Sequence, residues 1–253
     1  MGAKCVVCPA TGDFSIDFAA LEGLVGKHTK GVIFNSPNNP SGRVYSQQDL
    51  ERLCALLKKK SDEFSHPIFL IADEPYREIV YDKDVPYAMN FYADTIVCYS
   101  YSKSLSLPGE RIGYIAISPK ASHADELYFA ICGAGRSLGY VCAPSTYQKV
   151  VEKCVDALPD IAAYRKNRDL LSTSLQAIGY ECVRPDGAFY LMVKALEADA
   201  NLFSERAKNF GLLLVPSDDF GVTGYVRAAY CVSKDMIIRS EKAFVTLRSL
   251  FDD

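Results

Sequence analysis

An alternation of short apolar runs with an amphipathic segment constrains the fold of this chain most strongly. Residues 31–35 (GVIFN) and 67–73 (PIFLIAD) are short, rich in β-branched and aromatic side chains, and followed by polar or turn residues, as is typical of buried strands. Between them, residues 46–60 carry leucines at helical spacing, and Ser46 followed by Asp49 is the pattern of a capping box. This order of strand, helix and strand predicts a βαβ unit in a parallel-rich sheet.

The rest of the chain predicts more of this sheet and then a second unit. Residues 95–100 (TIVCYS) and 112–117 (IGYIAI) have the pattern of two more buried strands. From about residue 142 to 178 the pattern is mainly helical, and strands and helices then follow without βαβ regularity. We therefore expect an α/β fold with a partial large domain over residues 1–155 and a C-terminal α+β small domain over residues 156–253.

The composition argues against several classes of partner. The net charge is −3 and no basic block is present, so we expect neither nucleic acid nor an anionic membrane as a partner. No apolar run approaches ~18 residues, and the first residues lack the apolar core of a signal peptide. The nine cysteines are scattered, which predicts reduced thiols in a cytoplasmic protein. Cys5 and Cys8 form a single CxxC without a second pair of ligands, so we expect no metal site.

Polar groups follow the first two predicted strands. The segment NSPNNPSG, residues 35–42, must form an irregular loop, which is either a simple turn or part of a site. Asp73 closes an apolar run, and a buried carboxylate is costly unless it meets a cation or hydrogen-bond donors. It therefore caps a helix, forms an ion pair or faces a cationic group of a ligand. Ligands of parallel sheets bind at the carboxyl ends of the strands, where these residues lie.

Two cations flank the next two predicted strands. Lys103 comes just after residues 95–100, and a lysine that loses its solvation there can offer a neutral amine to an aldehyde. Arg111 precedes residues 112–117 and could grip a phosphate with two donors. Each residue taken alone is more typical of a turn or of a surface charge. Four suitable groups at four strand ends favour one shared ligand site.

The motifs NSPNNPSG, IADEPY, SYSKSLSLPGERIGY and VRAAYCVS resemble those of the class I/II aminotransferases. These enzymes have fold type I and depend on pyridoxal 5′-phosphate. The motifs occur in the family's order between residues 35 and 232, with comparable separations. The resemblance implies a cytoplasmic homodimer that exchanges an amino group between an L-amino acid and a 2-oxo acid, as in the aspartate aminotransferases.

The resemblance also implies which residues bind the cofactor. Lys103 matches the catalytic lysine, which carries the cofactor as an aldimine and later moves a proton on the substrate. Ser100 and Arg111 match the phosphate ligands, and Ser102 is a weaker match. Asp73 matches the carboxylate that pairs with the pyridine nitrogen and keeps it protonated.

Further matches lie near the substrate. Asn39 and Tyr76 match donors to the phenolic oxygen of the cofactor, and Asn39 also borders the substrate. Arg227 matches the arginine that clamps the substrate α-carboxylate. Arg136 lies roughly where some members place a cation for a second carboxylate, although an arginine there is more often a surface or interface residue. Gly187, in RPDGAF, predicts a tight turn before a strand.

Family members carry a long segment before the part that aligns with the start of this chain. That segment supplies a turn that cups the phosphate, an aromatic ring that stacks on the cofactor, and a tyrosine that reaches the site of the partner subunit. We therefore expect a C-terminal portion of such an enzyme, with impaired activity in isolation. Two alternatives stay open: a C–S lyase or synthase on the same scaffold, and a fragment that folds without cofactor and is inactive.

Overall fold

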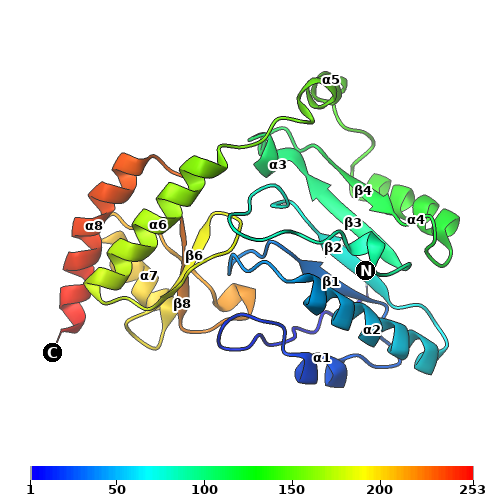
Figure 1. The fold of residues 1–253 in the computed structure, drawn as a ribbon, viewed down its shortest axis with the longest axis horizontal. Coiled ribbons are helices and arrows are strands. Elements are labelled where there is room, and N and C mark those ends of the chain that lie inside the picture. The colour runs from blue at the N-terminus through cyan, green and yellow to red at the C-terminus, as the bar shows by residue number, and fades with distance from the viewer. Residues whose placement is uncertain (1, 253) are drawn as a thin grey trace.

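Two four-stranded sheets, each with its own apolar core, make up the computed structural model, which describes residues 2–252 (Figure 1). In the first sheet β1, β2 and β3 run parallel, and β4 pairs antiparallel with β3. The strands are β1 (Gly31–Asn35), β2 (Phe69–Asp73), β3 (Thr95–Ser100) and β4 (Gly113–Ile117). The predicted α/β fold with a parallel-rich sheet is confirmed.

The helices of this first unit differ in how deeply they are buried. They are α1 (Phe18–Leu24), α2 (Gln47–Phe64), the 3₁₀-helix η1 (Ala88–Asn90), α3 (Tyr101–Ser104), α4 (Ala124–Ser137) and α5 (Ser145–Cys154). The helix α2 packs on one face of the sheet, whereas α4 and α5 have no buried residue. Figure 1 shows α5 standing away from the rest of the chain.

The helix α2 forms where its sequence pattern predicts it. The Ser46 side chain accepts a hydrogen bond from the Asp49 N–H at 3.1 Å, and the Asp49 carboxylate accepts one from the Ser46 N–H at 2.9 Å, so the predicted capping box is confirmed. Leu50, Leu53 and Leu57 are fully buried between the helix and the sheet. Burying a leucine side chain contributes about 1.5–3 kcal/mol. The βαβ unit is thus stabilised by the leucines that predict it.

The second sheet is antiparallel and belongs to the C-terminal part of the chain. Its strand order is β5-β6-β8-β7, formed by β5 (Cys182–Val183), β6 (Tyr190–Lys194), β7 (Val215–Pro216) and β8 (Tyr225–Ala229). The helices of this part are α6 (Ile161–Ile178), α7 (Ala200–Lys208), η2 (Asp218–Phe220), α8 (Lys234–Arg248) and η3 (Ser249–Phe251). The helices α6 and α8 lie side by side at the left of Figure 1.

Two of the strands predicted to be buried are not. Ile33 in β1 is 69% exposed and Ile115 in β4 is 52% exposed. The reason is that α2 covers only one face of the sheet, while strand register places Ile33 and Ile115 on the other face. That same face carries Asp73, which pairs in register with Asn35 on β1. The predicted ligand site therefore lies at the carboxyl end of the strands, on the uncovered face of the sheet.

The segment GLLLVP was expected to be a strand, but only Val215 and Pro216 pair with β8. Gly211 adopts a φ of +76° just after α7, and Leu212 and Leu214 enter the core while Leu213 stays exposed. Residues 212–214 therefore alternate between buried and exposed as a strand would, although they do not pair with β8. Among residues 2–252, no helix is long and apolar enough to cross a membrane, and no group of His, Cys, Asp or Glu side chains could hold a metal ion.

Candidate functional site

Lys103 lies in the short helix α3, directly beyond the carboxyl end of β3. Ser100 ends β3 and caps α3, because its side chain accepts a hydrogen bond from the Ser102 N–H at 3.3 Å. The Lys103 Nζ atom lies 5.9 Å from the ring centre of Tyr76 and 5.7 Å from that of Phe189. Within residues 2–252 it forms no ion pair. The amine is therefore held over aromatic rings rather than by a carboxylate.

Asp73 ends β2 and meets a donor from the neighbouring strand. The Asn35 Nδ2 group donates to the Asp73 carboxylate at 3.2 Å and to its backbone carbonyl at 2.8 Å. Burial raises the pKa of Asp73, because the half-buried charge loses water and gains no cation. Among the alternatives that the sequence leaves open, Asp73 neither caps a helix nor forms an ion pair with any described residue. The carboxylate remains available to a cation.

One hydrogen bond joins the loop after β1 to the second sheet. The Arg227 Nη1 group donates to the Asn39 Oδ1 atom at 2.8 Å. The Arg227 guanidinium also lies 4.4 Å from the ring centre of Tyr190 and 5.0 Å from that of Phe220. The Asn39 N–H in turn donates to the Asn35 side chain at 2.7 Å. Arg227 is thereby oriented by an amide and by two aromatic rings, and no carboxylate among residues 2–252 forms an ion pair with it.

Tyr76 is buried and links the lysine to the arginine. Its hydroxyl lies 3.1 Å from the Tyr190 hydroxyl, and either of them can be the donor. Burial is the main cause that raises the pKa of Tyr76, so its hydroxyl stays protonated at physiological pH. The contacts described so far connect one group of side chains, here called the strand-end cluster: Asn35, Asn39, Asp73, Tyr76, Lys103, Tyr190 and Arg227.

The predicted phosphate ligands lie less close together. The Ser100 hydroxyl donates to the Ser102 hydroxyl at 2.8 Å, directly next to Lys103 in sequence. Arg111 is exposed, adopts a φ of +53°, and donates to the Pro108 carbonyl of its own turn at 3.1 Å. The structure does not bring its guanidinium to the strand-end cluster. Arg136 is exposed in the last turn of α4, and no described contact links it to the cluster.

Sequence reasoning missed three members of this neighbourhood: Asn35, Phe189 and Tyr190. Asn35 is the last residue of β1, opposite Asp73, so the register of two predicted strands could have indicated it. Phe189 ends the turn that contains Gly187, and Tyr190 is the first residue of β6; for this segment the sequence suggested only a structural role. Their contacts with Lys103, Tyr76 and Arg227 come from a segment distant in sequence, and no local pattern predicts such contacts.

A surface groove lies elsewhere, between α2 and the residues before β3. Its charged lining includes Lys58, Asp62 and Asp94. Lys58 is already paired with Asp62 at 2.7 Å, and Asp94 accepts a hydrogen bond from the Ser122 N–H. Because each of these three charged groups already has a partner, none of them is comparable to Lys103 or Arg227.

Comparisons with known proteins find aminotransferases. The sequence model of the family described as "Aminotransferase class I and II" matches residues 1–239. A solved aminotransferase structure from Eubacterium rectale is 56% identical, with a TM-score of 0.92 over 97% of this chain and 62% of that one. The aspartate aminotransferase structure from Thermotoga maritima is 26% identical, with a TM-score of 0.82 over 94% of this chain and 61% of that one.

Curated relatives of the chain are also named as aminotransferases. The probable aspartate aminotransferase of Methanocaldococcus jannaschii is 28% identical over 95% of this chain and 63% of that protein. The probable N-acetyl-LL-diaminopimelate aminotransferase of Bacillus subtilis is 31% identical over 93% of this chain and 60% of that protein. The chain thus spans about three fifths of the length of the relatives that it matches.

Proposed function

The chain belongs to the class I and II aminotransferases, and we propose that its strand-end cluster is part of a transaminase site. The reaction is the exchange of an amino group between an L-amino acid and a 2-oxo acid. Enzymes of this family use pyridoxal 5′-phosphate. The observation that carries the proposal is the set of contacts through which the amine of Lys103, the carboxylate of Asp73 and the guanidinium of Arg227 belong to one cluster.

The donor set of the chain fits this cofactor. Lys103 offers an amine to the aldehyde, and Asp73 offers a carboxylate to the basic ring nitrogen. Burial raises the pKa of Asp73, and a protonated ring nitrogen would place a cation beside the carboxylate. Ser100 and Ser102 offer hydroxyls to the phosphate. Arg111 would join them only after leaving the Pro108 carbonyl.

The remaining residues orient the substrate and move a proton. When bound, the cofactor supplies an electron sink for the charge that develops at the substrate α-carbon. Lys103 takes and returns the proton at that carbon. Tyr76 and Asn39 would donate to the phenolic oxygen of the cofactor, and Tyr76 could do so because its raised pKa keeps it protonated. Arg227 binds the α-carboxylate, and its bond to Asn39 holds one face of the guanidinium in place.

Three finer expectations remain proposals: assembly as a homodimer, a cytoplasmic location, and weak cofactor binding by this chain alone. Weak binding is supported by the exposure of the sheet face on which Asp73 lies, because water there weakens every electrostatic contact with the cofactor. It is also supported by the outward position of Arg111, since a charge-assisted hydrogen bond contributes about 1.5–3 kcal/mol. We therefore expect a cofactor Kd above about 1 μM, equivalent to less than about 8.2 kcal/mol of binding.

The test is a titration of the chain with pyridoxal 5′-phosphate, followed by borohydride reduction and mapping of the modified lysine. We expect the label on Lys103, no label in Lys103→Ala, and an unchanged pattern in the control Lys58→Ala, whose lysine is exposed on α2. Labels spread evenly over surface lysines would contradict the proposal. An assay with L-aspartate and 2-oxoglutarate then separates the reactions, because a transaminase forms glutamate whereas a lyase releases ammonia.

A further inference from the structure

The loop that carries Asn39, residues 36–44, crosses the turn between β5 and β6, residues 184–189, backbone against backbone. The Gly42 carbonyl accepts hydrogen bonds from the N–H groups of Asp186 and Gly187, both at 2.9 Å. A Cβ atom on Gly42 would lie 2.2 Å from the Cβ atom of Pro185, and Gly42 has a φ of +69°. Only glycine fits this crossing. The loop cannot leave the turn without losing both hydrogen bonds.

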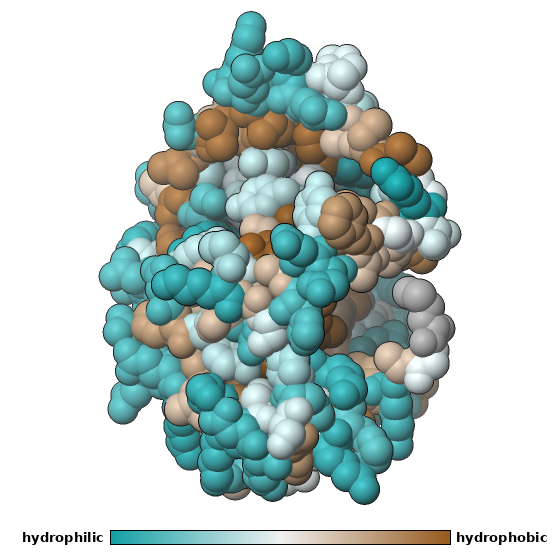
Figure 2. All heavy atoms as spheres, turned by 90° about the vertical axis from the view of Figure 1, so that its right-hand side faces the viewer, coloured by the Kyte–Doolittle hydropathy of each residue, from teal (hydrophilic) through white to brown (hydrophobic). Residues whose placement is uncertain are grey.

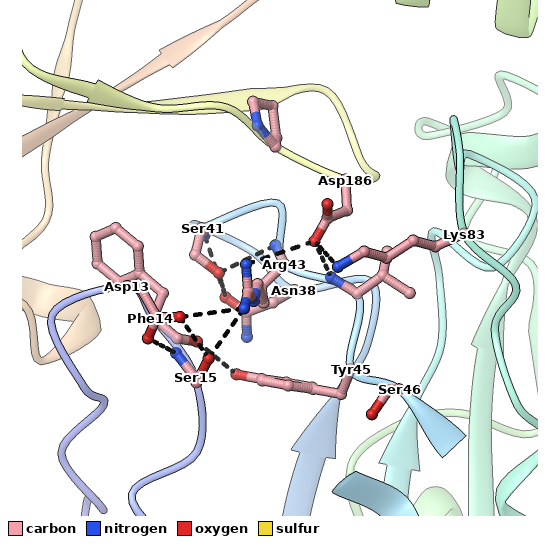
Figure 3. A network of polar contacts seen from close by, with 12 residues as sticks. Asp13, Phe14, Ser15, Asn38, Ser41, Arg43, Tyr45, Ser46, Lys83 and Asp186 are labelled. Carbon is pink, nitrogen blue, oxygen red and sulfur yellow. Dashed lines mark hydrogen bonds and ion pairs between the residues drawn. The ribbon is translucent and has the colours of Figure 1, made fainter. Parts of the chain in front are cut away.

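Charged side chains reinforce the crossing. Figure 3 shows the Asp186 carboxylate between Lys83 and Arg43. The Lys83 Nζ atom lies 2.9 Å from Asp186 Oδ2, the Val44 N–H donates to the same oxygen at 3.4 Å, and the Arg43 Nη1 atom lies 3.9 Å from it. We call Arg43, Lys83 and Asp186 the Asp186 latch. The Asp186 side chain is 21% exposed, so solvent screens these contacts less than those of an open surface pair.

Arg43 extends the contact to a third segment. Its Nη2 group donates to the Ser15 hydroxyl at 3.0 Å and lies 3.2 Å from the Asp13 carboxylate (Figure 3). Its backbone carbonyl accepts from the Asn38 N–H at 2.9 Å, and the Asn38 side chain accepts from the Ser41 hydroxyl at 2.8 Å. Arg43 thus closes the loop around Asn38 and binds it to its surroundings on two sides.

The two segments that the Asp186 latch joins are also the segments that position Asn39 and Arg227. On one side, Asn39 follows Asn38 in the loop that Arg43 closes. On the other side, the turn leads into β6, which pairs with β8 so that Met192 lies opposite Arg227. The loop, the latch, the turn, the two strands and the Asn39–Arg227 bond therefore form a closed ring of contacts. A shift of the loop against the turn must change the position of Asn39 relative to Arg227.

We propose that Arg43 and Asp186 are positioning residues for carboxylate recognition by Arg227, through the hold of the Asp186 latch on the Asn39 loop. The inference rests on the proposed role of Arg227 in binding the carboxylate of an amino acid or a 2-oxo acid. A guanidinium binds a carboxylate best when two donors are aligned with two oxygens, so a displaced Asn39 leaves Arg227 less well oriented. Loss of the latch should weaken carboxylate binding and leave the groups around Lys103 unchanged.

The experiment uses the cofactor-free chain and 2-oxoglutarate as the probe, with the Nε signal of Arg227 followed by NMR. We expect Asp186→Asn and Arg43→Gln each to raise the Kd for 2-oxoglutarate about threefold to fivefold, the range set by a partly exposed ion pair. Asp186→Glu should recover part of the affinity. The matched control is Asp62→Asn, which breaks a 2.7 Å ion pair on α2 far from the cluster and should leave the Kd unchanged.

Hydrogen exchange gives a second readout that does not depend on any ligand. The amides of Asp186 and Gly187, which donate to Gly42, should exchange faster in Asp186→Asn and Arg43→Gln. If Arg227→Lys binds 2-oxoglutarate as well as the unmodified chain does, the proposed role of Arg227 is wrong and the inference fails with it. If Arg227→Lys weakens binding but both latch variants bind normally, the proposed function stands and the latch inference is overturned, whatever the exchange rates.

Discussion

Burial has opposite consequences at neutral pH for two acidic groups of the strand-end cluster, Asp73 and Tyr76. Burial raises the pKa of both side chains, because a charge in the protein interior loses hydration. For Tyr76 the result is useful at neutral pH, since the phenol stays a donor. For Asp73 the result is a cost, since the carboxylate is charged at neutral pH without a cation beside it. The cost is removed when a ligand brings a positive charge.

Replacement of Asp73 by asparagine should stabilise the cofactor-free chain at neutral pH. A raised native pKa means that the stability contributed by this group is complete below its unfolded pKa of about 3.9 and is lost as the pH rises through the native pKa. Asp73→Asn keeps an acceptor for Asn35 but carries no charge. We predict that it raises the free energy of unfolding at about pH 7 and leaves it nearly unchanged at about pH 3.

Urea unfolding at the two pH values measures this difference. The control is Asp62→Asn, because that carboxylate is exposed on α2 and its substitution should not reproduce the effect. A less stable Asp73→Asn chain at neutral pH would show that the hydrogen bond from Asn35 outweighs the cost of burial. The same variant should bind pyridoxal 5′-phosphate more weakly, because the ring nitrogen loses its anionic partner.

At the scale of elements, α2 covers one face of the first sheet. A single substitution at the N-terminus of α2 tests how much the capping box stabilises the chain. Ser46→Ala removes the acceptor of the Asp49 N–H and one of the donors to the Asp49 carboxylate. We predict a loss of about 0.5–2 kcal/mol in the free energy of unfolding. Gln47→Ala is the matched control, because it lies on the exposed first turn. Equal losses in the two variants would mean that the capping box contributes nothing.

Local patterns in the sequence predict the elements well and their burial poorly. The helix α2 is predictable because its signals are local: they are the spacing of Leu50, Leu53 and Leu57 and the capping residues before them. The exposure of Ile33 depends on what covers the second face of the sheet, and no local pattern contains that information. The same holds for the short strand β7, whose pairing depends on β8.

In the candidate site, too, features set by local sequence are predictable and contacts between distant segments are not. Asp73 and Lys103 are predictable because strand ends in a parallel sheet meet at one edge. The bond between Asn39 and Arg227 and the Asp186 latch join segments that are far apart in the sequence, so only the folded chain reveals them. The position of Arg111 was not predictable either, because its backbone conformation turns the side chain back onto Pro108.

At the scale of the whole molecule, the first unit presents apolar side chains that its own helices do not cover. Ile33 and Ile115 lie on the open face of the first sheet, and α4 has no buried residue. Phe129 in α4 is 72% exposed, and Val141 after it is 79% exposed. Figure 2 shows the side of the molecule that lies at the right of Figure 1, and apolar residues gather near the top of this view between hydrophilic ones. Uncovered apolar surface of this kind favours association.

We predict that the chain self-associates in a concentration-dependent way, and that Phe129→Glu combined with Val141→Glu raises the dissociation constant about tenfold or more. The reason is that burying a phenylalanine contributes about 1.5–3 kcal/mol, and each 1.4 kcal/mol changes affinity about tenfold. Sedimentation velocity over a range of concentrations measures the effect. Leu202→Glu is the control, because Leu202 is similarly exposed but lies on α7 in the second unit. A monomeric unmodified chain, or an equal effect of Leu202→Glu, would contradict association through α4 and the segment after it.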